Sequence, residues 1–163
     1  MVESRHERLT RTPIEDGNAL VHWREIKPLH VVTKNYAVVA AMRHSPSLRL
    51  KNWSFRRLGM TVGEGVRFAL ESTPDVFFPE LITIDRDVIV GYDATLLCHE
   101  FLQEEYRTGP IHVGAEAMIG AGAIVLPGVE IGTGARIAAN SLVDADVPPE
   151  TTVAGVPATP VDR

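Results

Sequence analysis

Hydrophobic residues recur at every sixth position in the second half of the chain. The spacing is clearest between residues 111 and 156, where the recurring aliphatic residues are Val113, Ile119, Val125, Ile131, Ile137 and Val143. An amphipathic helix would place apolar residues three and four positions apart, and a half-buried strand would place them at every second position. A period of six is typical of neither element. It predicts a coil of short strands, each with one inward aliphatic side chain.

Small residues accompany this repeat. Glycine or alanine follows most of the aliphatic positions, and the fourth position after each one also carries little bulk. Examples of the first kind are Gly114, Gly120, Gly132 and Ala138. Tight turns between flat strands accept only small side chains. Three strands would then close one triangular coil of about eighteen residues, with successive coils about 4.8 Å apart and hydrogen-bonded to each other.

The repeat begins near residue 62 and is interrupted twice. Val62 opens it, and two prolines in the segment S-T-P-D-V-F-F-P-E-L mark a detour before it resumes at Ile84. Between Leu96 and Val113 the register breaks, because seventeen positions is not a multiple of six, and the residues between are polar. We therefore expect a protruding loop over about residues 99–110, and such interruptions of a solenoid often form its binding face.

The chain before the repeat follows other patterns. Residues 1–18 mix charged side chains with Thr, Pro and Gly, so they predict a tail that buries nothing, and residues 1–32 together are expected to be mobile or loosely ordered. A helix is expected from Thr33, as its N-cap, to Pro46, which stops it. A basic amphipathic helix follows and ends at Gly59.

Residues 33–59 are expected to cap the open end of the coil. A solenoid without terminal caps would expose unpaired amide and carbonyl groups at its end. The side chains expected to cover that end are Leu48, Trp53, Phe55 and Leu58. Contact of the basic helix with an anionic membrane surface is the less favoured alternative.

Composition narrows the class of protein. At 163 residues, with 45% hydrophobic and 23% charged side chains, the chain matches one ordinary globular domain. A net charge of −5 argues against nucleic-acid binding, which needs a basic face to displace counterions. The single cysteine forms no internal disulfide, and residues 1–13 contain no apolar run long enough for a signal peptide or a membrane span. We therefore expect a cytoplasmic protein.

His99 is the candidate catalytic residue, because it stands where the regular coil gives way to the polar loop. Neutral imidazole, whose unperturbed pKa is about 6.5, is suited to take a proton from a hydroxyl group at neutral pH. Cys98 precedes it, but neighbouring residues of a strand point to opposite faces, so we expect a buried thiol rather than a nucleophile. Glu100, Glu104 and Glu105 are close enough in sequence to orient His99, although a charge cluster in a loop is usually solvated. The remaining histidines are expected to be structural.

From about Val62 onward the chain resembles the galactoside and maltose O-acetyltransferase branch of the hexapeptide-repeat acyltransferases. The shared features are a coil that ends in a histidine, a loop after it, the coils I-G-A-G-A-I-V-L-P-G-V-E-I-G, and the closing V-P-P and V-A-G-V-P-A motifs. The resemblance implies a mainly β protein, with an N-terminal helical cap and a left-handed parallel β-helix over residues 60–163. The hand comes from the resemblance alone, since the general rule for parallel crossovers is right-handed.

The resemblance also implies an activity. An acyl group would pass from an acyl-coenzyme A, in the first instance acetyl-coenzyme A, to a hydroxyl group of a sugar or another small acceptor. His99 would act as general base, no metal would take part, and backbone amides near Gly120 and Ala121 of a neighbouring subunit would stabilise the oxyanion. Such sites lie between subunits, so a homotrimer is expected. Carried over by motif, the coenzyme-binding positions are Met118, Gly120, Ala121, Ala139, Asp144 and Thr159, and the acceptor-binding positions are Ala69 and Glu71.

Some of these positions depart from the family pattern. Tryptophan is frequent at the position of Met118, lysine at that of Ala145, and an arginine that meets coenzyme phosphate at that of Thr159. Missing positive charge weakens phosphate recognition, and Arg136 or Arg163 could compensate for it.

Two other functions remain open at this point. Ala69 replaces the sugar-binding asparagine of the family, so a sugar acceptor is not assured, and a non-catalytic β-helix scaffold is the main alternative. A zinc enzyme similar to the γ-type carbonic anhydrases is the less favoured one. Those enzymes share the β-helix but need three histidines around the metal, and the coils from Val113 onward contain none.

Overall fold

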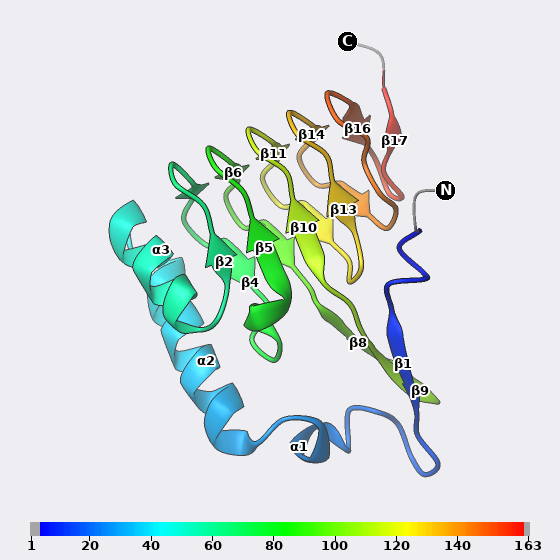
Figure 1. The fold of residues 1–163 in the computed structure, drawn as a ribbon. Helices are drawn as coiled ribbons and strands as arrows, with labels where there is room; N and C mark the ends of the chain where they lie inside the picture. Colours follow the sequence, from blue (N-terminus) through cyan, green and yellow to red (C-terminus); the bar gives the residue numbers. More distant parts are fainter. Residues whose placement is uncertain (1–3, 162–163) are drawn as a thin grey trace.

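Short parallel strands stacked in three flat sheets form the body of the protein in the computed structural model, which describes residues 4–161 (Figure 1). Sheet one contains β2 (Thr61–Val62), β5 (Ile82–Ile84), β10 (Ile111–Val113) and β13 (Glu130–Ile131). Sheet two contains β3 (Arg67–Phe68), β6 (Ile89–Val90), β11 (Met118–Ile119), β14 (Arg136–Ile137), β16 (Thr152–Ala154) and the antiparallel β17 (Thr159–Pro160). Sheet three contains β4 (Thr73–Pro74), β7 (Thr95–Leu96), β12 (Ile124–Val125) and β15 (Leu142–Val143). The chain visits the three sheets in turn, so it forms a parallel β-helix.

The six-residue period of the sequence is the distance from one strand to the next. Each regular strand places one aliphatic side chain in the interior, and these residues stack in register from coil to coil. On sheet two, Ile119 lies between Val90 and Ile137. All three side chains are at most 1% exposed. The predicted coil and its inward aliphatic residues are therefore confirmed.

Glycine is required where the coils turn. At the corner between sheets two and three, a Cβ atom on Gly120 would lie 2.6 Å from the backbone nitrogen of Ala139 in the next coil. A Cβ atom on Gly91 would lie 2.7 Å from the backbone nitrogen of Ala121. Coils stacked at the spacing of a β-sheet leave no room for such an atom. The small residues that accompany the repeat thus meet a packing requirement of the corners.

Three helices precede the β-helix: α1 (Trp23–Ile26), α2 (Leu29–Arg43) and α3 (Leu48–Arg57). The predicted start of a helix at Thr33 is wrong, because α2 begins directly after Pro28. Proline is compatible with the first turn of a helix, and the carbonyl group of Pro28 accepts hydrogen bonds from the amides of Val31 and Val32. No helix within residues 4–161 combines the length and the apolar composition that crossing a membrane requires.

The end of the β-helix is covered by polar groups as well as apolar ones. Phe55 and Leu58 are buried as predicted, but Leu48 and Trp53 are 38% and 55% exposed, so the prediction is wrong for these two. The physical reason is that carbonyl groups of the first coil have no further coil to pair with and need donors. Side chains of α3 supply them: Lys51 Nζ to Ala69 O at 2.6 Å, Asn52 Nδ2 to Val66 O at 2.9 Å, and Arg56 Nε to Val62 O at 2.8 Å. Two of the basic residues that suggested a membrane surface therefore bind the coil.

Replacing Lys51 with methionine is expected to lower the free energy of unfolding by about 1–3 kcal/mol, because the carbonyl group of Ala69 would lose its charged donor and keep the weaker, neutral donor Ser72 Oγ at 2.8 Å. Lys51 is 1% exposed. Burial lowers the pKa of its ammonium group, and the negative charge of Glu71, which raises this pKa, does not cancel the effect. Arg49→Met, at an exposed position of the same helix, is the matched control and should change stability by less than about 0.5 kcal/mol. Equal thermal midpoints for the wild type and Lys51→Met would contradict this function of α3.

The predicted loop leaves the coil as a two-stranded arm. β8 (His99–Phe101) and β9 (Glu105–Thr108) pair antiparallel, and the arm formed by residues 99–108 projects from the stacked coils (Figure 1). Its first residue is the candidate catalytic histidine. The prediction of a protrusion is confirmed, and the structure adds that it is a hairpin.

The N-terminal residues do not form the tail predicted for residues 1–18. β1 (Thr10–Pro13) pairs with β9, so the N-terminal strand lies along the free edge of the arm (Figure 1). Arg5 and Leu9 are only 7% and 9% exposed, and the prediction that this segment buries nothing is wrong. The segment has little apolar surface, but an unpaired strand edge offers backbone donors and acceptors that β1 satisfies. Residues 1–3 lie outside the described part of the chain.

Candidate active site

His99 lies next to a turn of the preceding coil. β4 and β7 are neighbours in sheet three, with Pro74 opposite Leu96. Asp75 follows β4, and the chain that follows β7 runs through Cys98 into His99. Parallel pairing of the two strands therefore brings Asp75 to the base of the arm.

Asp75 holds the imidazole of His99 through a short hydrogen bond. Nδ1 of His99 lies 2.6 Å from Oδ2 of Asp75. The same oxygen accepts a hydrogen bond from the amide of Cys98 at 2.6 Å, and Oδ1 accepts from the amides of Phe77 and Phe78 at 2.7 and 2.9 Å. The Asp75 side chain is fully buried. Its position is thus defined by bonds to its own turn and to the start of the arm.

The surroundings of Asp75 decide its charge. Burial alone would raise the pKa of Asp75, but the hydrogen bond and the charge of His99, together with two backbone amides, lower it, and the net result is a lowered pKa. Asp75 is then ionised at neutral pH and can only accept hydrogen bonds. The proton of a neutral imidazole resides on Nδ1, and Nε2 keeps its lone pair. An imidazole held in this way is prepared to act as a general base.

Aromatic side chains surround the imidazole. The centroid of the His99 ring lies 4.7 Å from that of Phe77, 4.8 Å from that of Phe101 and 6.1 Å from that of Phe78. Trp23 of α1 packs edge-on against Phe77 with the centroids 5.9 Å apart. The His99 side chain is 14% exposed. These rings restrict rotation of the imidazole and exclude water from most of its surface, which strengthens its electrostatic interactions.

Cys98, directly before β8, is the buried thiol that the sequence predicts. Its side chain is fully buried, whereas His99 is partly exposed. Burial, followed by the negative charge of Asp75, raises the pKa of the thiol. A thiolate is therefore not available for nucleophilic chemistry.

Asp75 is the functional residue that sequence reasoning missed. Two of the acids considered there are engaged elsewhere, since Glu100 pairs with Arg5 and Glu105 pairs with Arg107. Asp75 lies in the apolar detour of the chain, 24 positions before His99. Its local signal is an acidic residue between apolar ones, which is unusual unless the acid has a partner. The number of residues in the coil between Asp75 and His99 decides which residue lies beside Asp75. This coil does not follow the six-residue period, so its length could not be predicted from the sequence.

Four of the predicted coenzyme-binding residues lie together in the structure. Gly120, Ala121 and Ala139 form the corner between sheets two and three, and Met118 lies on β11 directly before it. Within residues 4–161 the backbone amides of Ala121 and Ala139 donate no hydrogen bond. Thr159 lies on β17, at the C-terminal end of sheet two. This corner can therefore offer backbone donors to a ligand.

Asp144 and His99 lie at a different corner from that group. Both follow strands of sheet three, β15 and β7, where the chain turns toward sheet one. Sheet three separates this corner from Gly120 and Ala121 in the same protomer. The residues that the resemblance combines in one site are thus divided between two corners of a single chain.

The predicted acceptor-binding positions are also apart from His99 in the protomer. Ala69 and Glu71 lie in the first coil, at the corner between sheets two and three. Glu71 forms ion pairs with Arg43 at 3.1 Å and with His44 at 2.8 Å, and α3 binds the carbonyl group of Ala69. In the protomer both residues connect the helices to the first coil.

Two further expectations concern charged groups. Arg136 lies on β14 directly opposite Met118 with an exposed side chain, so it offers a positive charge beside the predicted coenzyme positions. Arg163 lies outside the described residues. Among the residues that the structure describes, no group of three His, Cys, Asp or Glu side chains is arranged to hold a metal ion.

Comparison with known proteins reveals clear relatives. The family described as bacterial transferase hexapeptide (six repeats) matches residues 110–145. The chain is 43% identical over 148 residues, which is 90% of this chain and 86% of the relative, to "Putative acetyltransferase YvoF" of Bacillus subtilis (strain 168). A solved hexapeptide-repeat acetyltransferase of Vibrio cholerae shares the fold with a TM-score of 0.63 at 21% identity, over 82% of this chain and 90% of that one. Galactoside acetyltransferase in complex with coenzyme A shares it with a TM-score of 0.61 at 22% identity, over 82% and 80% of the two chains.

Proposed function

This chain belongs to the hexapeptide-repeat acetyltransferases, with their left-handed parallel β-helix, and from this premise we propose that it transfers an acetyl group from acetyl-coenzyme A to a hydroxyl group of a small acceptor. The observation that carries the proposal is the hydrogen-bonded pair of His99 and Asp75 at the base of the arm. The galactoside acetyltransferase of similar fold has been solved with coenzyme A, which supports the choice of acyl donor.

In the proposed reaction His99 is the general base. Its Nε2 takes the proton of the acceptor hydroxyl group while the hydroxyl oxygen attacks the carbonyl carbon of the thioester. The electrons of the carbonyl double bond move to the carbonyl oxygen, which becomes the oxyanion of a tetrahedral intermediate. The intermediate then expels the coenzyme thiolate, which receives the proton from the imidazolium. Asp75 stays ionised and stabilises the imidazolium between the two steps. No covalent enzyme intermediate is needed.

The oxyanion of the intermediate requires a donor, which we assign to the amide of Ala121 from a second protomer. Gly120 was the other expected donor, but its amide is bound to the carbonyl group of Ile137. The amide of Ala121 has no acceptor within residues 4–161, and small corner residues leave it accessible. Along the same edge, Met118 and Ala139 would contact the coenzyme.

The remaining coenzyme positions concern the phosphate groups. Arg136 is exposed beside Met118, so we assign to it the positive charge that is missing at Ala145 and Thr159. Thr159 and Asp144 stay predictions that rest on the motif alone.

A homotrimer would complete the site. The outward residues of sheet three are uncharged: Thr73, Thr95, Ile124 and Leu142. At the rim of this sheet, Leu70 and Tyr92 are 45% and 56% exposed. A threefold rotation with sheet three facing the axis would bring the His99 corner of one protomer to the Ala121 corner of the next. The two halves of the proposed site would then meet between protomers.

Replacing Ile124 with glutamate is expected to break this assembly, because three buried carboxylates would face one another near the axis. Light scattering should give a mass one third that of the wild type, and acetyl transfer should be lost with the assembly. Thr61→Glu, at an exposed position of sheet one, is the control and should leave the mass unchanged. A trimer formed by Ile124→Glu would show that another face is the interface.

The direct test of the proposed function is an assay of thiol release. The protein would be incubated with acetyl-coenzyme A and a panel of sugars, amino sugars and antibiotics, and release above the rate without acceptor would identify the acceptor class. Calorimetry with coenzyme A would be run alongside. No release with any acceptor, combined with no binding at millimolar coenzyme, would favour the non-catalytic scaffold.

A further inference from the structure

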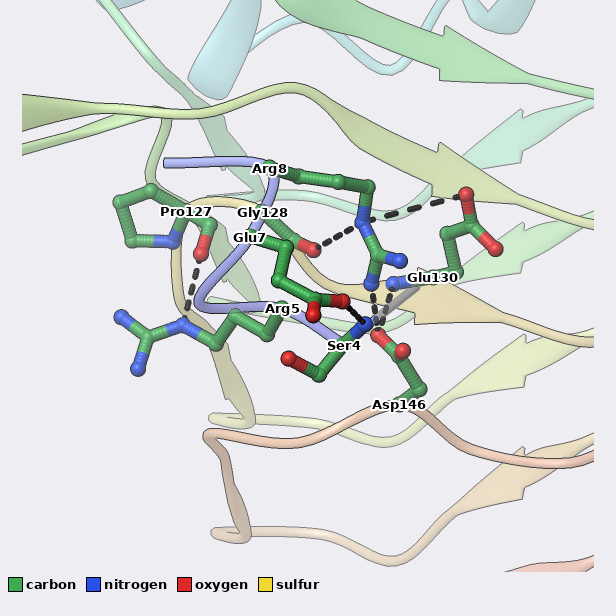
Figure 2. A network of polar contacts seen from close by, with 8 residues as sticks. All are labelled: Ser4, Arg5, Glu7, Arg8, Pro127, Gly128, Glu130 and Asp146. Atoms are coloured by element: carbon green, nitrogen blue, oxygen red, sulfur yellow. Dashed lines mark hydrogen bonds and ion pairs between the residues drawn. The ribbon is translucent and has the colours of Figure 1, made fainter. Parts of the chain in front are cut away.

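We propose that residues 4–13 are a clamp that positions the catalytic arm, with Arg5 as its central positioning residue. The proposal rests on the role assigned above to His99. The segment, called here the N-terminal clamp, pairs with the arm (Figure 1) and contacts a corner of the next coil (Figure 2). No motif of the sequence pointed to it, because its residues are charged and its partners are distant in the chain.

The clamp completes the sheet of the arm. β1 pairs antiparallel with β9, from Thr10 opposite Thr108 to the tip of the hairpin, where the amide of Ile14 donates to the carbonyl group of Glu104 at 2.8 Å. A hairpin of two short strands has marginal stability by itself, and pairing with a third strand stabilises it. The arm that starts with His99 is thus held along its free edge.

Arg5 joins the arm to the stacked coils. Its Nε donates to the carbonyl oxygen of Pro127 at 2.7 Å, and its Nη2 lies 3.1 Å from Oε2 of Glu100. The Arg5 side chain is 8% exposed, so both contacts form away from water, where charged hydrogen bonds are strong and directional. Glu100 directly follows His99. One guanidinium group therefore ties the strand that carries the imidazole to the next coil.

Arg8 anchors the clamp to the body. Its Nε donates to the carbonyl oxygen of Gly128 at 2.9 Å, and its Nη2 donates to Oδ1 of Asp146, which also accepts from the amide of Glu130 at 2.9 Å (Figure 2). Gly128 has a φ of +81°, and a Cβ atom there would lie 2.8 Å from the carbonyl oxygen of Arg5. The missing side chain at Gly128 lets the clamp approach the corner this closely.

The clamp would act on the position of His99. Alternate residues of β8 point to opposite faces, so Glu100 faces Arg5 while the imidazole faces the aromatic side chains. Asp75 and the aromatic rings hold β8 from one side, and Arg5 holds it from the other. A displacement of about 1 Å between reacting groups costs on the order of a hundredfold in rate. Arg5 reaches His99 only through Glu100, so it is a positioning residue.

The test compares Arg5→Met with Arg11→Met in the full chain. Arg11 is an exposed residue of β1 whose side chain has no partner within residues 4–161. Arg5→Met is expected to lower kcat for acetyl transfer about tenfold to a hundredfold and to change KM for acetyl-coenzyme A less than about twofold, because alignment is lost while the coenzyme site is intact. Arg11→Met should keep both constants. If Arg5→Met does not fold, Arg5→Lys takes its place in the test. One ammonium group cannot bind both Pro127 and Glu100 as the guanidinium group does, so kcat should fall by a similar factor.

Hydrogen exchange gives a readout that does not depend on activity. Amides of the arm are expected to exchange at least about tenfold faster in the Arg5 variants than in the wild type, whereas those of β11 and β14 should be unchanged. Three results would each overturn the proposal. They are unchanged exchange in the arm of the Arg5 variants, a folded Arg5 variant with kcat within twofold of the wild type, and a raised KM at constant kcat. If the wild type transfers no acetyl group, the proposed function fails, and the exchange comparison alone decides whether the clamp holds the arm.

Discussion

Replacing His99 with asparagine is expected to lower kcat for acetyl transfer by a factor of about 10² to 10⁴ and to leave the fold and the assembly intact. The side-chain amide of asparagine can still donate a hydrogen bond to the buried carboxylate of Asp75, but it cannot take a proton from the acceptor. Without a base, the acceptor hydroxyl group attacks the thioester as a poor nucleophile. Steady-state kinetics with the acceptor identified by thiol release would measure the loss.

His99→Ala serves as the companion variant. It should lose as much activity as His99→Asn, but it should also be less stable by about 1–3 kcal/mol, because Asp75 would remain buried without one of its donors. Coenzyme A binding, measured by calorimetry, should be unchanged in both. If His99→Asn retains more than a tenth of the wild-type kcat, His99 is not the general base.

Replacing Asp75 with asparagine is expected to have the second largest effect, a loss of about 10² to 10⁴ in kcat. The new side chain is expected to keep its oxygen toward the amides of Phe77 and Phe78, so its NH2 group replaces Oδ2 and loses the hydrogen bond from the amide of Cys98. That NH2 group would donate to Nδ1 of His99, so the imidazole proton would move to Nε2, the atom that must accept the acceptor proton. The imidazole would be present but in the wrong tautomer. KM for acetyl-coenzyme A should change little, and nitrogen NMR of the imidazole should report the exchanged tautomer.

Glu104→Gln is the matched control for Asp75→Asn. Glu104 is an exposed acid of the arm, and it was one of the acids close to His99 in sequence. Its loss of charge should change kcat less than about twofold. Similar losses in the two variants would mean that negative charge near the arm matters, rather than the hydrogen bond to His99.

Asp75→Asn should also alter acid stability. The pKa of Asp75 is lowered from its ordinary value of 3.8, because the contacts with His99 and the amides outweigh burial. A lowered pKa in the folded state contributes stability above pH 3.8 that is lost as the pH falls through the folded value. The difference in thermal midpoint between the wild type and Asp75→Asn should therefore shrink as the pH falls below about 4. A difference that does not shrink would show that Asp75 has no lowered pKa.

The coil could be predicted because its signal is local and repeated. One aliphatic residue in each strand recurs every six positions, and a small residue follows it at most corners. Gly120 shows why, since a Cβ atom there would strike the next coil. The protrusion after Leu96 could be predicted for the same reason, as a break in a regular period. His99 was identified by its place at that break together with the motif of the family.

The helical cap was predicted only in part. Apolar side chains were expected over the end of the coil, and Phe55 meets that expectation. Trp53 is exposed, and Lys51 is buried in contact with the carbonyl group of Ala69. The free backbone groups of the first coil determine this arrangement, and a hydrophobicity pattern carries no information about them.

The amino-acid sequence by itself determined the β-helix, the place where the arm leaves it and the histidine at that place, because each depends on residues only a few positions apart. The tertiary structure alone decided what holds that histidine. Asp75 lies 24 positions away from His99, and Arg5 lies 122 positions away from Pro127. Such partners are brought together by the number of residues in each coil and by the path of the N-terminal segment. The coil between Asp75 and His99 does not follow the six-residue period, and the N-terminal segment has no repeat. The contacts that orient the imidazole therefore could not be predicted from a periodic pattern.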